Sequence, residues 1–442
     1  MTERGAALPS PGHTFDPGSP IYWDEAAVRQ ELERVFDICH GCRLCFNLCP
    51  SFPTLFKFVD AHDGSVPGLA ASEVEEVVDL CWQCKLCYVK CPYTPDDGHA
   101  FQLDFPRLLM RHVAVRARRR GLGFAGRMFG HPELVGKVGT LLPALANAAS
   151  RNTLNRWLME KMTGIDRHKA LPLFAAQRFS TWLARNPKAV PSEARNGRAA
   201  LFYTCVIENN VPHVGKAALE VLTRNRVAVT IPEQRCCGMP ALEQGDVAGA
   251  IERARANVAA LLPLVRAGHS VIALEPTCSY TLRREYPVLL RTDEAREIAA
   301  AVRDIHEYLW ELKNAEKLDR GFASTPGTVG YHVPCHLKAQ NIGFRSRDVM
   351  RLIPGTTVKL VDACSCHDGT WAMRKGHFPV SLSWGKKAFD GMKDACAAVY
   401  VSDCSLAALQ FAQALDIHPL HPIEVVALAY RPDGFPTPVP AP

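Results

Sequence analysis

The sequence predicts a helical domain with two cysteine runs, a basic helical connector, and two copies of a small α/β domain built on a parallel sheet. The first observation behind this fold class is length, because 442 residues suffice for about three domains. The second is the distribution of the 17 cysteines, which leaves none in residues 92–204. The third is a repeat among the later cysteines, which indicates a duplicated domain.

The composition excludes several classes of protein. Hydrophobic residues make up 48% and charged residues 22% of the chain, as in ordinary globular proteins. No stretch reaches the ~18 apolar residues of a membrane-spanning helix, and the first residues lack the apolar core of a secretion signal. We therefore expect a cytoplasmic protein. An odd number of cysteines there favours metal ligands and redox thiols over disulfides.

Two cysteine runs share one spacing, C-x2-C-x2-C-x3-C-P. The first run contains Cys39, Cys42, Cys45 and Cys49, and the second contains Cys81, Cys84, Cys87 and Cys91. This is the bacterial pattern for 4Fe–4S clusters, in which the fourth cysteine ligates the other cluster. Paired zinc sites are the alternative, but zinc favours C-x2-C units separated by a long spacer. We expect two 4Fe–4S clusters, one on Cys39, Cys42, Cys45 and Cys91, the other on Cys81, Cys84, Cys87 and Cys49.

The surroundings of both runs have helical character. Apolar residues at helical spacing precede the first run, and Ser72 and Glu75 form a capping-box pattern ahead of the second. The runs start 42 residues apart, with an insert between them. We therefore predict an α-helical ferredoxin domain over residues 23–105 that conducts electrons. Proline-rich residues 1–22 and 433–442 are expected to be flexible tails.

A basic stretch opens the connector predicted over residues 106–197. Seven arginines and no acidic residue lie between Arg107 and Arg127, interleaved with apolar residues. Such a stretch suits peripheral contact with an anionic membrane, here the inner face. A solvated helix face, or arginines that neutralise the nearby clusters, is an equal alternative. Nucleic-acid binding is not expected, because the net charge is only +6 and no binding motif accompanies the arginines.

The C-terminal half repeats itself at a nearly constant offset. Cys205 precedes Cys335 by 130 residues, Cys236 precedes Cys364 by 128, and Cys278 precedes Cys404 by 126. Most of these cysteines follow strand-like apolar runs, with helical stretches between them. We expect two α/β units with parallel sheets, residues 198–325 and 326–432. Cysteines at successive strand ends of a parallel sheet should meet at one edge.

Several motifs in this half carry a family resemblance. They are Phe202-Tyr-Thr-Cys205, Arg235-Cys-Cys-Gly-Met-Pro240, Thr277-Cys-Ser-Tyr-Thr-Leu-Arg283, Tyr331-His-Val-Pro-Cys-His336, Gly369-Thr-Trp371 and Ser402-Asp-Cys404. Together with the two earlier runs, they resemble the CCG-domain family over nearly the whole chain. That family includes heterodisulfide reductase subunits and the iron–sulfur subunits of glycolate, lactate and anaerobic glycerol-3-phosphate dehydrogenases, the last being the most similar.

The resemblance implies a further metal centre in each copy, although the full family pattern is incomplete here. Residues 281 and 407 are not the second cysteine of a closing C-x2-C, and the second copy has Cys-Ser-Cys in place of Cys-Cys. The remaining sets are Cys205, Cys236, Cys237 and Cys278, and Cys335, Cys364, Cys366 and Cys404. His336 and His367 either ligate a metal, move protons or serve structure. Cys396 is expected to be a small buried apolar residue.

The resemblance implies an electron-transfer subunit. A flavoprotein dehydrogenase would deliver electrons to the ferredoxin clusters, and they would pass through the CCG half to quinone or another acceptor. No nucleotide-binding signature occurs in the chain, so the dehydrogenase is expected to be another protein. Two alternatives stay open: a heterodisulfide or thiol–persulfide reductase acting at the CCG cysteines, and a scaffold that holds zinc there.

Overall fold

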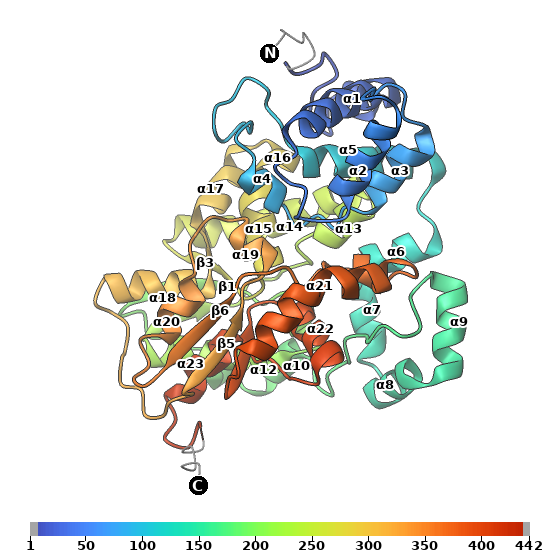
Figure 1. The fold of residues 1–442 in the computed structure, drawn as a ribbon. Coiled ribbons are helices and arrows are strands. Elements are labelled where there is room, and N and C mark those ends of the chain that lie inside the picture. The colour runs from blue at the N-terminus through green and yellow to red at the C-terminus, as the bar shows by residue number, and fades with distance from the viewer. Residues whose placement is uncertain (1–7, 436–442) are drawn as a thin grey trace. The chain divides into compact units, whose positions relative to one another are not determined.

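The computed structural model describes residues 8–435, which divide into two compact units (Figure 1). Unit 1 holds residues 8–131 together with Gly238–Glu252 and Val288–Arg291. Unit 2 holds Pro132–Cys237, Arg253–Pro287 and residues 292–435. Within the described part of the chain, no helix combines the length and the apolar character needed to cross a membrane.

Unit 1 is helical, as the sequence predicts. Its elements are η1 (Pro20–Trp23), α1 (Glu25–Cys42), α2 (Ser51–Ala61), α3 (Ala71–Asp79), α4 (Leu86–Lys90), α5 (Phe105–Arg120), α6 (Phe124–Gly130) and α13 (Met239–Glu243). The Asp24 carboxylate caps α1 by accepting from the Ala27 amide, and Asp104 caps α5 at Arg107. Helix α5 packs against α1, and α2 packs against α3. The apolar stripe of α1 is buried, which confirms its helical spacing.

The expected capping box at Ser72 and Glu75 is wrong. Helix α3 starts two residues earlier in register, and the Glu73 carboxylate accepts from the Ala70 amide at 2.8 Å. Glu75 instead forms ion pairs with Arg116 and His112 of α5. The reason is tertiary, because α5 supplies cations that a local reading of the sequence does not include.

The described part of the predicted N-terminal tail, residues 8–22, makes specific contacts within unit 1. The buried Arg111 guanidinium donates to the carbonyls of Gly12 and Tyr22, at 2.7 and 2.8 Å, and to that of Ile21. His13 contacts Glu31 of α1 at 2.9 Å. The remaining residues of the two predicted tails, 1–7 and 436–442, lie outside the described residues.

Unit 2 contains two parallel sheets. The first has the order β2-β1-β3-β4, made of β1 (Gly197–Phe202), β2 (Val227–Thr230), β3 (Ser270–Ala273) and β4 (Val302–Asp304). The second has the order β6-β5-β7, made of β5 (Thr328–His332), β6 (Thr357–Val361) and β7 (Val399–Ser402). All strand pairs are parallel, which confirms the expected sheet type. Most of β1 and β5 is buried, as strands of covered parallel sheets are.

Helices surround both sheets of unit 2. Those of the connector are α7 (Pro132–Gly139), α8 (Pro143–Arg151), α9 (Thr153–Thr163) and α10 (Phe179–Arg185), followed by η2 (Pro187–Ala189). The first sheet is accompanied by α11 (Cys205–Asn209), α12 (Pro212–Arg224), α14 (Val247–Arg266), α15 (Pro276–Tyr280), η3 (Thr281–Glu285), α16 (Tyr286–Leu290), α17 (Asp293–Ala301) and α18 (Ile305–Asn314). The first residues of α14 and the last residues of α16 belong to unit 1. The second sheet is accompanied by α19 (Cys335–Lys338), α20 (Arg345–Met350), η4 (Trp371–Met373), α21 (His377–Asp394), α22 (Ser405–Leu415) and α23 (Pro422–Ala429).

The core of unit 2 is apolar and continuous from one sheet region to the other. Its largest cluster includes Leu201, Ile272, Leu309 and Val426, all essentially inaccessible to solvent. Helix α23, which follows the second sheet in sequence, packs on α12 of the first (Figure 1). The two sheet regions therefore share an apolar cluster, and none of its described members is a cysteine.

Candidate metal centres

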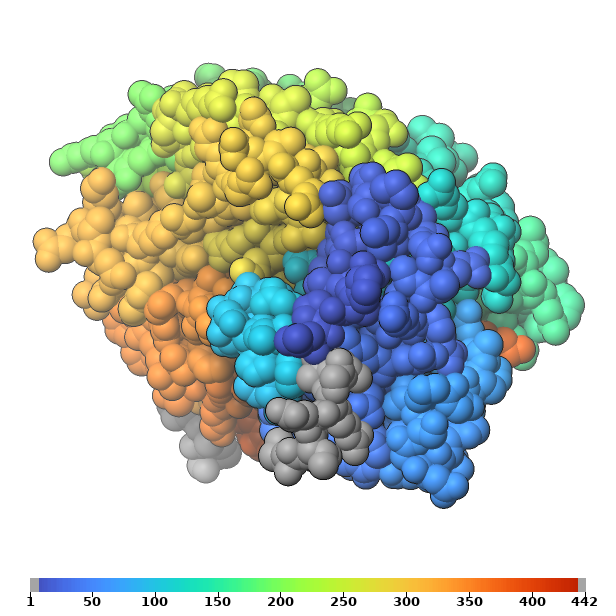
Figure 2. Space-filling view, turned by 90° about the horizontal axis from the view of Figure 1, so that it is seen from above, coloured from blue at the N-terminus to red at the C-terminus, as the bar shows by residue number. Residues whose placement is uncertain are grey.

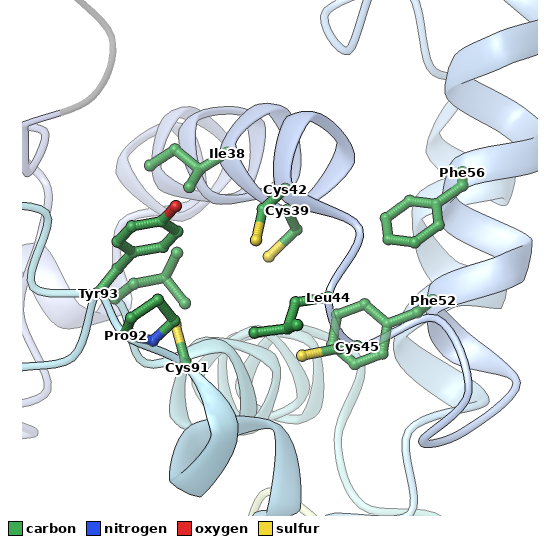
Figure 3. Close-up of a pocket in the computed structure, with 11 residues that line it drawn as sticks. Ile38, Cys39, Cys42, Leu44, Cys45, Phe52, Phe56, Cys91, Pro92 and Tyr93 are labelled. Atoms are coloured by element: carbon green, nitrogen blue, oxygen red, sulfur yellow. The ribbon is translucent and has the colours of Figure 1, made fainter.

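The first candidate centre is a hollow in unit 1 that collects cysteines from both runs. Cys39 and Cys42 lie at the end of α1, Cys45 lies in the following turn, and Cys91 directly follows α4. Their sulfur atoms point into the same space (Figure 3). The hollow measures about 300 Å³, part of it open to solvent. The structure thus brings together the set expected for one cluster, including the fourth cysteine from the other run.

The backbone geometry explains how the first run bends around this hollow. Arg43 ends α1 in the left-handed conformation, with φ of 53°, and its amide donates to the Cys39 carbonyl. This reverses the chain so that Cys45 faces the end of the helix it has just left. Apolar side chains, among them Phe52, Phe56 and Leu103, line the rest of the hollow. Such a lining limits the access of water to a bound group.

Segments from the two runs are also neighbours on the surface of unit 1. Figure 2 shows the cyan segment that follows the second run beside the blue N-terminal helical region. The Tyr93 ring, two residues after Cys91, lines the hollow together with Ile38 of α1 (Figure 3). Sequence spacing alone did not indicate Tyr93 as part of this site.

The second candidate centre collects the other four cysteines of the two runs. Cys49, Cys84 and Cys87 are buried, and Cys81 is half-buried. Burial raises the pKa of Cys87, and the neighbouring thiols of Cys84, Cys81 and Cys49 raise it further. Cys49 is affected in the same way, first by burial and then by Cys81 and Cys84. Thiols affect the pKa of one another in this way only when they are close. Cys49 of the first run therefore lies near Cys81, Cys84 and Cys87 of the second.

Both sets suit a positively charged inorganic group. Burial raises the pKa of Cys45 to about 12, and the nearby Cys91 and Cys42 thiols add to this effect. Four thiolates this close repel one another unless cations lie between them. All four donors in each set are sulfur, which is the donor set of iron–sulfur clusters. The residues present therefore fit a 4Fe–4S group in each set.

The arginines of α5 are largely occupied by acidic partners and carbonyls. Arg107 pairs with Asp104, Arg116 with Glu75 and Asp79, and Arg119 with Glu25. Arg118 lies over the Trp23 ring at 4.7 Å. Most of the positive charge that the sequence shows in this stretch is thus engaged within unit 1.

The first cysteine set of unit 2 lies at the carboxyl ends of three neighbouring strands. Cys205 follows β1, Cys236 and Cys237 follow β2, and Cys278 follows β3. The Cys205 and Cys236 sulfurs are 3.9 Å apart, and Cys237 contacts both Cys236 and Cys278. The four residues expected to share one sheet edge therefore do so.

In the second cysteine set of unit 2, contacts connect three of the four cysteines. The Cys335 and Cys364 sulfurs are 3.1 Å apart, and the Cys366 amide donates to the Cys364 sulfur at 3.3 Å. Cys404 follows β7 at the same end of the sheet, but its charged neighbours are Glu275 and Asp368. The structure thus brings three of these cysteines together and leaves Cys404 beside carboxylates.

Residues next to the two cysteine sets contact each other within unit 2. Thr277 Oγ1 and His336 Nδ1 are 2.9 Å apart, and the Tyr280 ring stacks on His336. The Ser405 amide and hydroxyl donate to the Glu275 carboxylate. His336 therefore has a structural partner of its own, whereas His367 is buried beside Lys169.

One buried residue, Glu275, was not predicted from the sequence, and another residue, Cys396, was wrongly predicted to be buried. Glu275 is buried, and burial raises its pKa to about 8. In the sequence, Glu275 stands three residues before Cys278. A single glutamate near a cysteine is too common to predict a functional residue. Cys396, expected to be buried, is exposed, because it follows the end of α21 with a positive φ of 41° and not a helical conformation.

The helical unit and the sheet-edge cysteines define an iron–sulfur protein with a cysteine-rich CCG domain. Residues 32–121 match the family described as the citrate utilization protein B Fer4-like domain, and residues 199–283 match the CCG cysteine-rich domain. The chain is 28% identical over 306 residues to the C subunit of anaerobic glycerol-3-phosphate dehydrogenase from Escherichia coli strain K12, covering 68% of this chain and 75% of that protein.

Further relatives match shorter parts of this chain. The chain is 28% identical over 194 residues to lactate utilization protein A of Geobacillus thermodenitrificans, covering 42% of this chain and 77% of that protein. It is 25% identical over 246 residues to the B subunit of fumarate reductase (CoM/CoB) from Methanothermobacter marburgensis, covering 53% and 47%. The resemblance seen in the motifs is thereby confirmed.

Proposed function

We propose that this chain is the electron-transfer subunit of a dehydrogenase complex and carries two 4Fe–4S clusters in unit 1. The observation that carries the proposal is the hollow where Cys39, Cys42 and Cys45 meet Cys91 from the other run. The second cluster would use Cys81, Cys84, Cys87 and Cys49. When bound, the clusters supply one-electron redox chemistry. The chain's own residues bind them and restrict water through the apolar lining.

The proposal extends to a duplicated C-terminal half with one metal centre per copy. The shared strand order supports duplication, because β2-β1-β3 and β6-β5-β7 place equivalent cysteines after equivalent strands. The proposed boundaries remain residues 198–325 and 326–432. Metal ligands in the first copy would be Cys205, Cys236, Cys237 and Cys278, and in the second Cys335, Cys364, Cys366 and Cys404. The contacts between Thr277 and His336 support electron passage from one set to the other.

The electron donor would be a flavoprotein dehydrogenase, and the acceptor quinone or another carrier. Support comes from the names of relatives, which are subunits of a glycerol-3-phosphate dehydrogenase and of a fumarate reductase. The test is anaerobic isolation of the full chain with its partner, followed by flavin analysis. Adding glycerol 3-phosphate, lactate or glycolate should then reduce the clusters, read as a new EPR signal. A complex that contains flavin but leaves the clusters oxidised with every donor would argue against this role.

Iron and sulfide counts on the isolated chain test the cluster content. We expect about eight irons if only unit 1 binds clusters, and more if the sheet-edge cysteines also do. Cys278→Ser should lower the count only in the second case, with Cys396→Ser as the matched control on an exposed cysteine. An iron content well below eight in anaerobic protein would contradict the assignment for unit 1.

A thiol–disulfide or persulfide reductase is the second candidate, favoured by the close approach of the Cys335 and Cys364 sulfurs. This role predicts two thiols that alkylate rapidly in reduced protein and are protected after oxidation. Metal bound at these cysteines would block alkylation in both states. Peptide mapping after labelling therefore separates the two candidates.

We propose peripheral membrane contact at α7–α9 in preference to the basic stretch of α5, whose arginines are mostly engaged. The apolar residues exposed on α7–α9 and in the turn between α7 and α8 are Leu134, Val135, Val138, Leu141, Leu142, Leu145, Leu154, Trp157, Leu158 and Met162. Lys137, Arg151 and Lys161 are exposed among them, while Glu133 pairs with Arg253 and Glu160 is buried. Apolar and basic groups together suit an anionic lipid surface. The location would be the cytoplasmic face.

Flotation with vesicles tests this contact. The chain should float with vesicles that contain anionic lipid, and Leu141→Asp with Leu145→Asp should abolish this. Arg118→Ala with Arg120→Ala serves as the matched control on α5 and should float normally. Loss of flotation in the control alone would return the contact to the basic stretch.

A further inference from the structure

Three polar side chains distant in sequence meet in the interior of unit 2. Asp304 ends β4, His306 lies in the first turn of α18, and Asp403 directly follows β7. None is more than 1% exposed. Two carboxylate oxygens and the His306 Nδ1 atom lie within 4.8 Å of one another. The proposed electron path uses none of these groups.

The spacing of the three groups suits donors arranged around one ion. His306 Nδ1 is 3.5 Å from Asp403 Oδ1 and 3.8 Å from Asp304 Oδ1. A charge-assisted hydrogen bond would be about 2.7–2.9 Å, and neither ring nitrogen of His306 has a hydrogen-bond partner. Tetrahedral ligands that are each about 2.0–2.2 Å from zinc lie about 3.3–3.6 Å from one another. The observed separations are close to that geometry.

The charge of the cluster also calls for a cation. Two buried carboxylates are costly unless opposite charge accompanies them. Among residues 8–435, neither aspartate forms an ion pair with lysine or arginine, and His306 is the partner of both. With both aspartates ionised, an imidazolium would leave one negative charge in excess. A divalent cation with neutral His306 balances both aspartates.

Neighbouring groups hold the two carboxylates in place. The Tyr331 hydroxyl donates to Asp403 Oδ2 at 2.7 Å, and the Ser346 hydroxyl donates to Asp403 Oδ1. The His306 amide donates to Asp304 Oδ1 at 3.1 Å, as part of the cap of α18. Metal ligands are typically fixed by such outer hydrogen bonds.

We propose that Asp304, His306 and Asp403 bind one zinc ion, separate from the cysteine sets. Mixed nitrogen and oxygen donors suit a divalent first-row cation, and zinc accepts a site of three protein ligands. Because Asp304 ends a strand of the first sheet and Asp403 follows a strand of the second, the ion ties the two sheets together. Its burial closes the site to substrates, and a water molecule would complete the four-coordinate shell of the zinc ion.

Zinc analysis of the anaerobically purified full chain tests the proposal. We expect about one zinc per chain in the wild type and at least a tenfold loss in His306→Gln. The matched control is His332→Gln, a buried histidine that contacts Ser402 at the end of β7. The control should keep its zinc. Iron content and circular dichroism show whether each variant is folded.

X-ray absorption at the zinc edge separates this site from the cysteines. The proposal expects nitrogen and oxygen near 2.0–2.1 Å and no sulfur near 2.3 Å. Should His306→Gln fail to fold, Asp304→Asn keeps the side-chain shape and removes one charge. That variant would be stripped with a chelator and offered zinc alone. Three results would each overturn the proposal. They are a zinc shell made only of sulfur, full zinc content in His306→Gln, and no uptake of added zinc by the wild type.

Discussion

The two units use cysteine in opposite relations to the fold. In unit 1, cysteines from both runs lie at helix ends and line a hollow, so a bound metal would join the turn after α1 to the end of α4. In unit 2, the sheet-edge cysteines stand on a large apolar core built by both sheet regions and their helices. We therefore expect bound metal to contribute more to the stability of unit 1 than to that of unit 2. Mutations should separate these two cases.

The largest expected effect is in unit 1. Cys45→Ser or Cys87→Ser should remove one cluster, about half of the iron bound by unit 1, and destabilise the unit, because metal binding there is coupled to folding. Iron analysis and EPR of the anaerobic protein measure the loss, with Cys396→Ser as control. Full iron with an unchanged EPR spectrum in either variant would show that the substituted cysteine is not a cluster ligand.

Substitution of the fourth cysteine in each run should give the next largest effect, because each fourth cysteine is expected to ligate the cluster of the other run. Cys49→Ser should perturb the cluster of Cys81, Cys84 and Cys87, since Cys49 lies among them. Cys91→Ser should perturb the cluster of Cys39, Cys42 and Cys45, because these residues share a hollow. The EPR signal of the Cys39 cluster should remain in Cys49→Ser, and that of the Cys81 cluster should remain in Cys91→Ser. If each variant lost the cluster of its own run, the exchange would be wrong.

The hydrogen bonds of Arg111 stabilise unit 1 independently of metal. Arg111→Met should lower the free energy of unfolding by about 3 kcal/mol, because two buried carbonyls and the partly buried carbonyl of Ile21 lose a charged donor. Arg120→Met, at an exposed position of the same helix, is the control. Anaerobic urea titration measures both. Equal midpoints for the two variants would show that the Arg111 contacts do not stabilise unit 1.

Acid should weaken unit 1 through Glu31. Burial on its own would raise the pKa of this carboxyl, but hydrogen bonds from His13 and Arg34 outweigh it and lower the pKa to about 2. The carboxylate therefore stabilises the fold above its unfolded pKa of 4.5, and this contribution, up to about 3 kcal/mol, is lost as pH falls towards 2. Glu31→Gln should flatten the stability profile over that range, whereas Glu33→Gln should not. Parallel acid profiles for Glu31→Gln and wild type would refute this role.

The smallest effect should come from the cysteines of unit 2. Cys278→Ser should remove metal from the first sheet edge yet change the unfolding free energy of unit 2 by only about 1 kcal/mol. Calorimetry beside metal analysis tests this. Destabilisation as large as that of Cys45→Ser would mean that both units depend on metal, and the contrast between them would disappear.

The sequence predicted the helical unit, the parallel sheets and the convergence of most cysteines, because spacing and strand ends are local signals. It did not predict the contacts of Arg111, which depend on a segment about 90 residues earlier in the chain. The cluster of Asp304, His306 and Asp403 was missed for the same reason, since about 100 residues separate its two carboxylates. Single acidic or basic residues carry no spacing from which such partners can be inferred.

Errors in the predictions arose where tertiary partners changed a local preference. Glu75 matched a capping pattern, but arginine and histidine on α5 attract its carboxylate. Cys396 lay among alanines that suggested a buried helix, yet α21 ends two residues before it. The role of Cys404 as a fourth ligand stays a prediction, and its neighbours Glu275 and Asp368 could not be inferred from the sequence.

Helix α13 has a practical consequence for dividing this protein. Although it follows the paired cysteines of the first sheet, α13 belongs to unit 1 and packs on α5 and α6. Gly130 and Gly245 mark how close the approach is, because a Cβ on Gly245 would lie 2.7 Å from that of Ala117. A gene fragment that stops at His131 would encode every cysteine of both runs but omit this support. An isolated electron carrier would therefore need α13 grafted back through a new linker.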